Sequence, residues 1–322
     1  MGKLFAIGEV LIDFIPMQKG TALKNVRSFE RAPGGAPANV AAAVSKYGQK
    51  SSMISKLGKD AFGDFLVETL MEAGVETDKL FRTDEANTAL AFVSLKENGE
   101  RDFSFYRNPS ADLLLNEEEI DPSWFEEDDF LHFCSVDLVE SPMKQAHKKT
   151  IKAVTEAGGL VSFDPNVRLP LWKSKEDCRK AILEFLPLAD VVKVSDEELE
   201  FITGIRNQEK ALQSLFVGKV KAVVFTKGAH GAELILRSEI YKSNGYSVEV
   251  KDTTGAGDAF IGGFLYKVME LNTSSSNLES TLHLHHKEIL SFANASGALT
   301  TTGFGAISAL PSKEQIESLL KG

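Results

Sequence analysis

Residues 37–74 decide the fold of this chain, and their sequence is PANVAAAVSKYGQKSSMISKLGKDAFGDFLVETLMEAG. The stretch passes from helical periodicity to a largely apolar run at 51–58 and back to helical periodicity. Apolar runs of the same kind occur at 4–8, 130–135, 160–164, 189–195 and 221–226. Such runs are typical of strands buried on both faces, and their alternation with helices is typical of a parallel sheet. The sequence therefore predicts an α/β fold with one doubly wound, mainly parallel sheet covered by helices.

Two stretches depart from this alternation. Residues 88–106 show period-two runs on either side of Glu97-Asn98-Gly99-Glu100, and Asn-Gly is a strong hairpin signal. Residues 10–32 also have strand character but no helix after them. We predict that 10–32 and 88–107 form a small antiparallel β lid, inserted in a single domain that spans 1–322.

A polar segment at 272–288 begins with a serine run and separates two helical patterns. This composition predicts a surface connection. His283, His285 and His286 lie in it, and we interpret them as exposed side chains of that connection and not as a metal site.

Composition limits the classes of partner. The net charge of −10 argues against binding to nucleic-acid backbones, which needs clustered Lys and Arg. The chain lacks an apolar run of the roughly 18 residues that a membrane span needs, and its first residues have the pattern of a strand and not of a secretion signal. Two cysteines, Cys134 and Cys178, are too few for a disulfide framework. We therefore expect a cytoplasmic protein without nucleic-acid or membrane partners.

The most informative stretch is 250–263, VKDTTGAGDAFIGG, which predicts a glycine-rich turn that opens a helix. Backbone N–H groups at a helix start have no intrahelical acceptor, and the helix dipole adds partial positive charge there. Gly255, Ala256 and Gly257 can therefore form an anion hole for a phosphoryl group in transfer. Asp258, in the first helical turn, can accept the proton of an attacking hydroxyl. A tight turn in which Asp258 is only an N-cap is the structural alternative.

Two other phosphate-binding motifs do not fit this stretch. A dinucleotide fingerprint needs glycine three positions after Gly257, where Phe260 stands. A Walker motif needs lysine after its last glycine, but Gly262 is followed by Gly263.

A second glycine pair, Gly34-Gly35, precedes a predicted helix that carries Pro37 near its first turn. Such a turn exposes backbone donors, and the side-chain amide of Asn39 on the first helical turn suits sugar hydroxyls. A plain helix start is the alternative for this segment taken alone.

Together, GGAPAN at 34–39 and DTTGAGD at 252–258 resemble the paired signatures of the PfkB, or ribokinase-like, carbohydrate kinase family. The order and separation of the motifs match, and the resemblance covers essentially the whole chain, from IGEVLID at 7–13 to ALPSKEQIESLL at 309–320. Within the family, the runs NPSADLLL, FDPNVRLPLW and KVSDEELEFITG look most similar to fructokinases. The resemblance implies a ribokinase-like fold and ATP-dependent phosphorylation of a sugar.

The resemblance also implies roles for single residues. Asp258 would be the base, and the amides before it would form the anion hole. The sugar would lie against Asp13, Gly34, Gly35, Asn39, Arg107 and Glu140. For Asp13 the alternative is a turn or cap residue, and for Glu140 it is part of a capped helix start.

Two arginines complete the expected sugar site. Arg107, at the end of the lid, would reach over the sugar, whereas Arg168 follows a strand end and would hold the sugar or the transferring phosphate bidentately. A solvated side chain is the alternative for each of them.

For the nucleotide, the family pattern implies contacts from Lys193, Ser195, Glu198, Thr226, Lys227, Gly228, Gly231 and Asn294. The turn at 301–305 would border the adenine, and Mg²⁺ would bridge the phosphates, mainly through water. One departure is that Ser195 replaces the asparagine of the family's Asn-x-x-Glu motif, while Glu198 matches it. Asp252 and Thr254 match a monovalent-cation site, suited to K⁺, beside the anion hole.

These features predict a kinase that transfers the γ-phosphoryl group of ATP to the 6-hydroxyl of fructose. A 2-keto-3-deoxygluconate kinase is an alternative, because Phe105-Tyr106-Arg107 also resembles the run that such enzymes use for the substrate carboxylate. A catalytically silent sugar sensor on the same fold is another. The expected partners are a small sugar and ATP, and a homodimer through the lid is compatible with this family.

Overall fold

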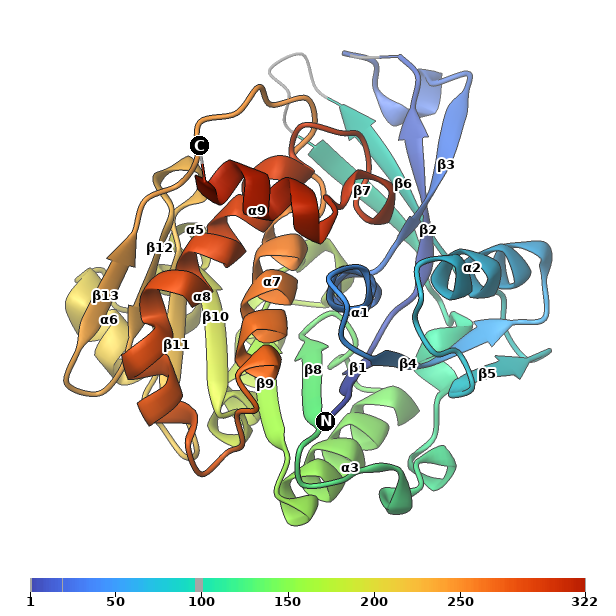
Figure 1. Cartoon of the computed structure of the whole chain (residues 1–322). Coiled ribbons are helices and arrows are strands. Elements are labelled where there is room, and N and C mark those ends of the chain that lie inside the picture. Colours follow the sequence, from blue (N-terminus) through green and yellow to red (C-terminus); the bar gives the residue numbers. More distant parts are fainter. Residues whose placement is uncertain (1, 19, 96–100, 322) are drawn as a thin grey trace.

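A nine-stranded sheet dominates the computed structural model of the chain, which describes residues 2–18, 20–95 and 101–321 (Figure 1). Its strand order is β13-β12-β11-β10-β9-β8-β1-β4-β5. The strands are β1 (Leu4–Ile7), β4 (Ser51–Gly58), β5 (Leu80–Thr83), β8 (Phe130–Cys134), β9 (Leu160–Asp164), β10 (Val191–Ser195), β11 (Ala222–Thr226), β12 (Ala232–Ile235) and β13 (Ile240–Ser243). Every pair from β5 to β11 is parallel, and β12 and β13 add an antiparallel edge.

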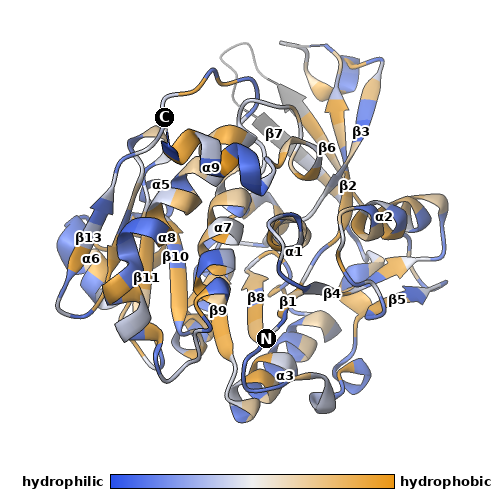
Figure 2. Cartoon of the chain, viewed as in Figure 1, coloured by the Kyte–Doolittle hydropathy of each residue, from blue (hydrophilic) through white to orange (hydrophobic). Residues whose placement is uncertain are grey.

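Helices cover both faces of this sheet, as expected for a sheet whose central strands are mostly hydrophobic (Figure 2). One face packs against α1 (Ala36–Lys46), α2 (Ala61–Glu72), α7 (Ala256–Glu270), α8 (Leu278–Thr300) and α9 (Lys313–Lys321). The other packs against α3 (Pro142–Ala157), α4 (Lys175–Phe185), α5 (Asp196–Thr203) and α6 (Gln208–Ser214). The predicted doubly wound, mainly parallel sheet is confirmed. Among the described residues, no helix is both long and apolar enough to cross a membrane.

The parallel strands place several chain segments at one edge of the sheet. Because β1, β8, β9 and β10 run in the same direction, the segments that follow them meet at their shared carboxyl edge. This edge is where open α/β sheets bind ligands.

The lid is a four-stranded sheet with the order β3-β2-β6-β7. Its strands are β2 (Leu11–Pro16), β3 (Phe29–Gly34), β6 (Ala89–Leu95) and β7 (Arg101–Tyr106). The pairs β2–β3 and β6–β7 are antiparallel as predicted, but β2 and β6 pair in parallel, so the prediction of a wholly antiparallel lid is wrong at its centre. Two separate hairpins meet there, and hairpin signals do not determine how two hairpins pair with each other. The predicted Asn98-Gly99 turn lies outside the described residues.

The polar segment at 272–288 differs from its prediction as a surface connection. Helix α8 begins inside it at Leu278 and continues to Thr300. Leu278 and Leu282, one helical turn apart, are both buried in the core and anchor this part of the helix. The serine run at 274–276 precedes the helix, and the three histidines project from its first half and are exposed or partly exposed.

Candidate active site

A cavity of about 560 Å³ lies between the lid and the carboxyl edge of the large sheet. From the lid it is lined by Leu11, Asp13, Ile15, Val93 and Phe105. From the sheet edge and the helix starts it is lined by Gly35, Asn39, Asn166, Arg168, Lys193 and Asp258. Segments far apart in the sequence therefore enclose one polar cavity, at the position where the fold favours a ligand.

A second cavity, of about 380 Å³, adjoins the first and is more apolar. Lys193, Ser195, Glu197, Thr253 and Gly257 line both cavities. The two cavities therefore meet at the glycine-rich turn before α7.

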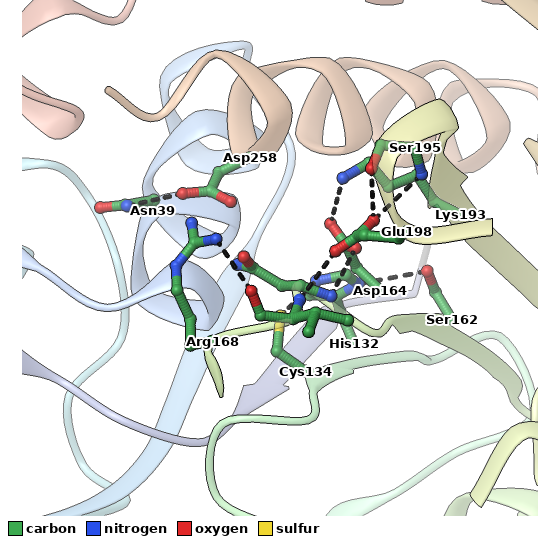
Figure 3. A network of polar contacts seen from close by, with 12 residues as sticks. Asn39, His132, Cys134, Ser162, Asp164, Arg168, Lys193, Ser195, Glu198 and Asp258 are labelled. Carbon is green, nitrogen blue, oxygen red and sulfur yellow. Dashed lines mark hydrogen bonds and ion pairs between the residues drawn. The ribbon is translucent and has the colours of Figure 1, made fainter. Parts of the chain in front are cut away.

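Asp258 stands at this junction, in the first turn of α7. The Asn39 side-chain amide donates a hydrogen bond to Asp258 Oδ2 at 2.8 Å (Figure 3). Burial raises the pKa of Asp258, while the bond from Asn39 and the charges of Lys193 and Arg168 lower it in part. The result is a partly buried carboxylate whose pKa lies above that of an ordinary aspartate, as a proton acceptor requires.

The turn before α7 needs glycine at its first position. Gly255 has φ 73°, in the left-handed region that glycine favours, and a Cβ there would lie 2.6 Å from the Ala306 Cβ. The amides of Gly257 and Asp258 fall in the first helical turn, where N–H groups have no intrahelical acceptor. The turn can thus present backbone donors and the positive end of the helix dipole to an anion.

A buried ion pair lies beneath the turn. Lys193 Nζ donates to Asp164 Oδ2 at 2.7 Å, and both side chains are almost fully buried (Figure 3). Burial raises the pKa of Asp164 to about 6, even though the charge of Lys193 opposes this shift. The ammonium group faces both cavities and can add positive charge next to the anion hole.

Ser195 has a structural role at the start of α5. It is the N-cap of α5 and forms a capping box with Glu198, whose Oε2 accepts from the Ser195 amide at 3.0 Å and hydroxyl at 2.7 Å. Glu198 Oε1 also accepts from the Val167 amide at 2.7 Å. Burial opposes ionisation of Glu198, but the charge of Lys193 and these bonds lower its pKa. A carboxylate is thereby held in ionised form beside the first cavity.

Most residues predicted for the sugar site lie at the first cavity. Asp13, Gly35, Asn39 and Arg168 line it. Gly34 packs closely against the Asp13 carboxylate and leaves no room for a side chain, since a Cβ at Gly34 would lie 2.3 Å from Asp13 Oδ2.

Two predicted sugar residues lie elsewhere. The Arg107 side chain is 4% exposed and is ion-paired with Asp112 and Asp137, so it does not reach over the first cavity as expected. Its two carboxylate partners neutralise the guanidinium within the protein. Glu140 is directed to solvent, with 79% of its side chain exposed, and pairs with Lys144. The loop that leads into α3 carries it away from the cavity, which Val136 lines instead.

The residues predicted for the nucleotide line the second cavity, except Lys227 and Glu198, and Glu198 lines the first cavity instead. Thr226, Gly228, Gly231 and Asn294 line the second cavity together with Lys193 and Ser195. Lys227 is turned toward strand β12, where its Nζ donates to Glu233 at 2.7 Å. Of the turn at 301–305, Thr301 lines the cavity.

Asp252 organises the turn that precedes the anion hole. Its carboxylate accepts from the Thr254 amide at 3.0 Å and hydroxyl at 2.7 Å, and from the Gly305 amide at 3.0 Å. A cation role for Asp252 and Thr254 stays a prediction. Within residues 2–18, 20–95 and 101–321, no group of three or more His, Cys, Asp or Glu side chains is arranged to hold a metal ion.

Two cavity residues were missed by the sequence interpretation. Asn166 has φ 44°, and its amide donates to Asp164 Oδ1 at 3.1 Å. Glu9 is a buried acid two residues after the end of β1. The run IGEVLID offered a signal for Glu9, because a carboxylate inside an apolar strand end is uncommon, whereas no pattern in the sequence indicates the backbone geometry of Asn166.

Comparisons with known proteins give the family. Residues 1–313 match the pfkB family of carbohydrate kinases. Probable fructokinase-4 of Arabidopsis thaliana is 43% identical over 320 residues, which cover 99% of this chain and 97% of that protein. Fructokinase-2 of Solanum lycopersicum is also 43% identical, over 322 residues, which cover 100% of this chain and 97% of that protein.

Solved structures agree with this assignment. The fructokinase from Xylella fastidiosa with bound ATP is 36% identical, with a TM-score of 0.91 and coverage of 99% of this chain and 98% of that one. The fructokinase from Vibrio cholerae O395 in its fructose, ADP and calcium ion bound form is 34% identical, with a TM-score of 0.87 and 99% coverage of both chains. The predicted fold is confirmed, and this chain belongs to the pfkB family of carbohydrate kinases.

Proposed function

We propose that this chain is an ATP-dependent fructokinase, which transfers the γ-phosphoryl group of ATP to the 6-hydroxyl of fructose and releases fructose 6-phosphate and ADP. The observation that carries the proposal is the meeting of a polar cavity and a more apolar cavity at the glycine-rich turn, with Asp258 at their junction. The similar proteins with bound fructose and ADP, or with bound ATP, support the same pair of ligands.

In this mechanism Asp258 accepts the proton of the 6-hydroxyl as that oxygen attacks the γ-phosphorus. Asn39 holds Asp258 Oδ2, which leaves the other carboxylate oxygen to receive the proton. The backbone amides of the turn at Gly255–Gly257 stabilise the charge that develops on the phosphoryl oxygens. Lys193 and Arg168, which both line the first cavity, add positive charge to it.

The residues present fit a magnesium–nucleotide complex. Glu197 and Glu198 line the first cavity and Glu197 also lines the second, so carboxylate oxygens are available to water molecules around Mg²⁺. Bound Mg²⁺ would neutralise phosphate charge. For the cation site we propose K⁺ near Asp252 and Thr254. Two similar structures, both of the fructokinase from Vibrio cholerae O395, are in a calcium ion bound form and a potassium ion bound form.

The arrangement favours a neutral sugar over a keto acid. The acidic side chains that line the first cavity are Glu9, Asp13, Glu197, Glu198 and Asp258. Only Arg168 and Lys193 among its described lining residues are basic, and Lys193 is already paired with Asp164. A substrate carboxylate would meet net negative charge here, and Arg107, which the keto-acid alternative requires, is paired with two buried aspartates.

A direct test is the release of ADP and of phosphorylated sugar in the presence of fructose, ribose, 2-keto-3-deoxygluconate or adenosine, with Mg²⁺ and with K⁺ or Na⁺. We expect the highest kcat/KM for fructose, with phosphate on the 6-hydroxyl as determined by NMR of the product. Preference for the keto acid would overturn the substrate assignment but not the kinase chemistry. Binding of fructose and ATP without any product would favour the silent sensor.

Three wider features are also proposals. We expect a single cooperative unfolding transition for 1–322, a homodimer through the lid that light scattering would detect, and a cytoplasmic location that fractionation would test. One relative, 43% identical, is named as chloroplastic, so the location can vary within the family.

A further inference from the structure

Helix α1 lacks a side-chain cap of its own. Its N-cap is Gly35, which has no side chain, and the helix instead receives an acceptor from a distant residue. Glu9 Oε1 accepts a hydrogen bond from the Ala36 amide at 3.0 Å, and Glu9 is only 3% exposed. Either protonation state of Glu9 leaves an oxygen that can accept this hydrogen bond, so the contact does not depend on a charged side chain. Glu9 therefore caps α1 from outside the helix.

The capped end of α1 carries a residue that contacts the base. Asn39 lies one turn into the helix, and its amide nitrogen holds Asp258 Oδ2 at 2.8 Å. The Glu9 contact therefore fixes the end of the helix from which Asn39 reaches Asp258.

On its other side Glu9 faces a buried charged cluster. The charges of Asp137 and Arg107 both act on it, and Arg107, which directly follows lid strand β7, is paired with Asp112 and Asp137. Glu9 Oε2, Asp137 Oδ2 and Arg107 Nε are buried without hydrogen-bond partners in the described part of the chain. We call Arg107 with Asp112 and Asp137 the lid anchor. Glu9 thus bonds to the start of α1 and is also acted on by the charges of the lid anchor.

We propose that Glu9 is a positioning residue that holds α1, through the Ala36 amide, in the place where Asn39 can orient Asp258. Glu9 belongs to the wall of the sugar cavity but acts through Asn39 and not on the reacting atoms. The proposal rests on the proposed function in one respect, which is that Asp258 serves as the base.

Loss of the Glu9 contact should change how activity falls at low pH, which is the acid limb of the pH profile. The groups that act on Asp258 are Asn39, Lys193 and Arg168, and of these only Asn39 is carried by α1. Asp164 and Cys134 lie close enough that the charge of Asp258 raises their pKa values. A hydrogen bond to a carboxylate lowers its pKa, so a displaced Asn39 raises the pKa of Asp258. Since the base must be ionised, activity is then lost at a higher pH.

The test compares variants at Glu9 by kcat/KM for fructose over a range of about pH 5 to 9. Glu9→Met keeps a similar length but has no acceptor, and we expect its acid limb to move up by about one pH unit. Glu9→Gln keeps an acceptor oxygen, and burial with the charge of Asp137 already favours the protonated form of Glu9. We therefore expect the acid limb of Glu9→Gln to stay within about 0.3 pH units of that of the unchanged protein. Glu9→Asp is one methylene shorter, and we expect it to shift the acid limb to higher pH as well. This variant replaces Glu9→Met in the test if Glu9→Met does not fold.

Asp190→Leu is the matched control. Asp190 is also a buried carboxylate that accepts from a backbone amide, Val161 N at 3.0 Å, but it does not contact α1. We expect this variant to lose stability without a shift of the limb. An unchanged limb in the Glu9→Met or Glu9→Asp variant, a full shift in Glu9→Gln, or an equal shift in Asp190→Leu would overturn the proposal.

A readout without turnover separates this proposal from the proposed function. NMR of isotope-labelled aspartate carboxyls, with Asp258 assigned by its absence in Asp258→Asn, follows the titration of the base directly. We expect the same upward shift of its pKa in Glu9→Met. If that shift is seen in a protein that does not phosphorylate fructose, the function fails and the positioning role stands.

Discussion

At the scale of the residue, Asp258 combines two properties that usually oppose each other. It is partly buried, and this loss of hydration favours the neutral acid, yet Asn39, Lys193 and Arg168 each favour the carboxylate. This balance keeps a proton acceptor next to the anion hole without full hydration. These four residues come from four separate segments of the chain, so the arrangement cannot be recognised from any one segment alone.

We expect Asp258→Asn to lower kcat by roughly 10² to 10⁴, the usual contribution of a positioned general base. Fructose and ATP should still bind, because the amide keeps the size and position of the carboxylate. Steady-state kinetics and isothermal titration calorimetry measure the two effects. Asp64→Asn is the matched control, since Asp64 also lies in the first turn of a helix but pairs with Arg82 away from both cavities. Near-normal turnover in the Asp258 variant would remove this residue from the mechanism.

Single residues were predictable where local geometry determines their place. The run DTTGAGD indicates a turn and a helix start, and Gly255–Gly257 and Asp258 lie in that turn and in the first turn of α7. Arg107 and Glu140 were misplaced because the direction of a long side chain depends on partners distant in sequence. Asp137 lies 30 positions from Arg107, and no pattern around either residue indicates their pairing.

At the scale of the element, the lid closes the sugar cavity with one face of a four-stranded sheet. Leu11, Asp13, Ile15 and Val93 lie at alternate positions along β2 and β6 and line the cavity. Period-two patterns predicted these strands, but the parallel pairing of β2 with β6 follows from the packing of two hairpins. Similarly, the serine run led to the prediction of a surface connection, although α8 begins directly after it and buries two leucines one helical turn apart.

We expect the amides of β6 and β7 to exchange more slowly when fructose is added, because the sugar would contact the face of the lid and restrict its opening. Hydrogen exchange followed by mass spectrometry measures this protection. The hairpin of β12 and β13 serves as a control within the same molecule, since it lies at the far edge of the large sheet from the lid. Equal exchange in the lid with and without fructose would contradict a closing lid.

At the scale of the whole molecule, the overall negative charge of the chain differs from the local charge at the second cavity. A net charge of −10 would repel a nucleotide, yet the second cavity is lined largely by uncharged groups and meets Lys193 at the junction. Local positive charge and backbone donors therefore outweigh the overall field at short range. At the lid anchor, by contrast, three buried acids surround one cation, because Arg107 pairs with Asp112 and Asp137 and its charge also acts on the adjacent Glu9.

This anchor makes the stability of the whole molecule depend on pH in a defined direction. Burial raises the pKa of Asp137 to about 7 although Arg107 lowers it, and Arg107 also lowers the pKa of Glu9. A group whose pKa is raised on folding binds more protons in the folded state, so its effect on stability becomes less favourable as pH rises. Removal of Arg107 raises both pKa values further and extends this loss to higher pH.

We therefore expect Arg107→Met to lower the free energy of unfolding by about 3–5 kcal/mol near pH 8, because it leaves buried carboxylates without their cation. Near pH 5.5 the acids are protonated more readily, and the deficit should be smaller by roughly 1–2 kcal/mol. Urea unfolding followed by circular dichroism at both pH values measures the difference. Arg206→Met is the matched control, since Arg206 forms an exposed pair with Glu200 and its removal should cost less than about 0.5 kcal/mol at either pH. An equal deficit for Arg107→Met at the two pH values, or a selective loss of keto-acid phosphorylation with unchanged stability, would show that Arg107 serves a substrate and not the anchor of the lid.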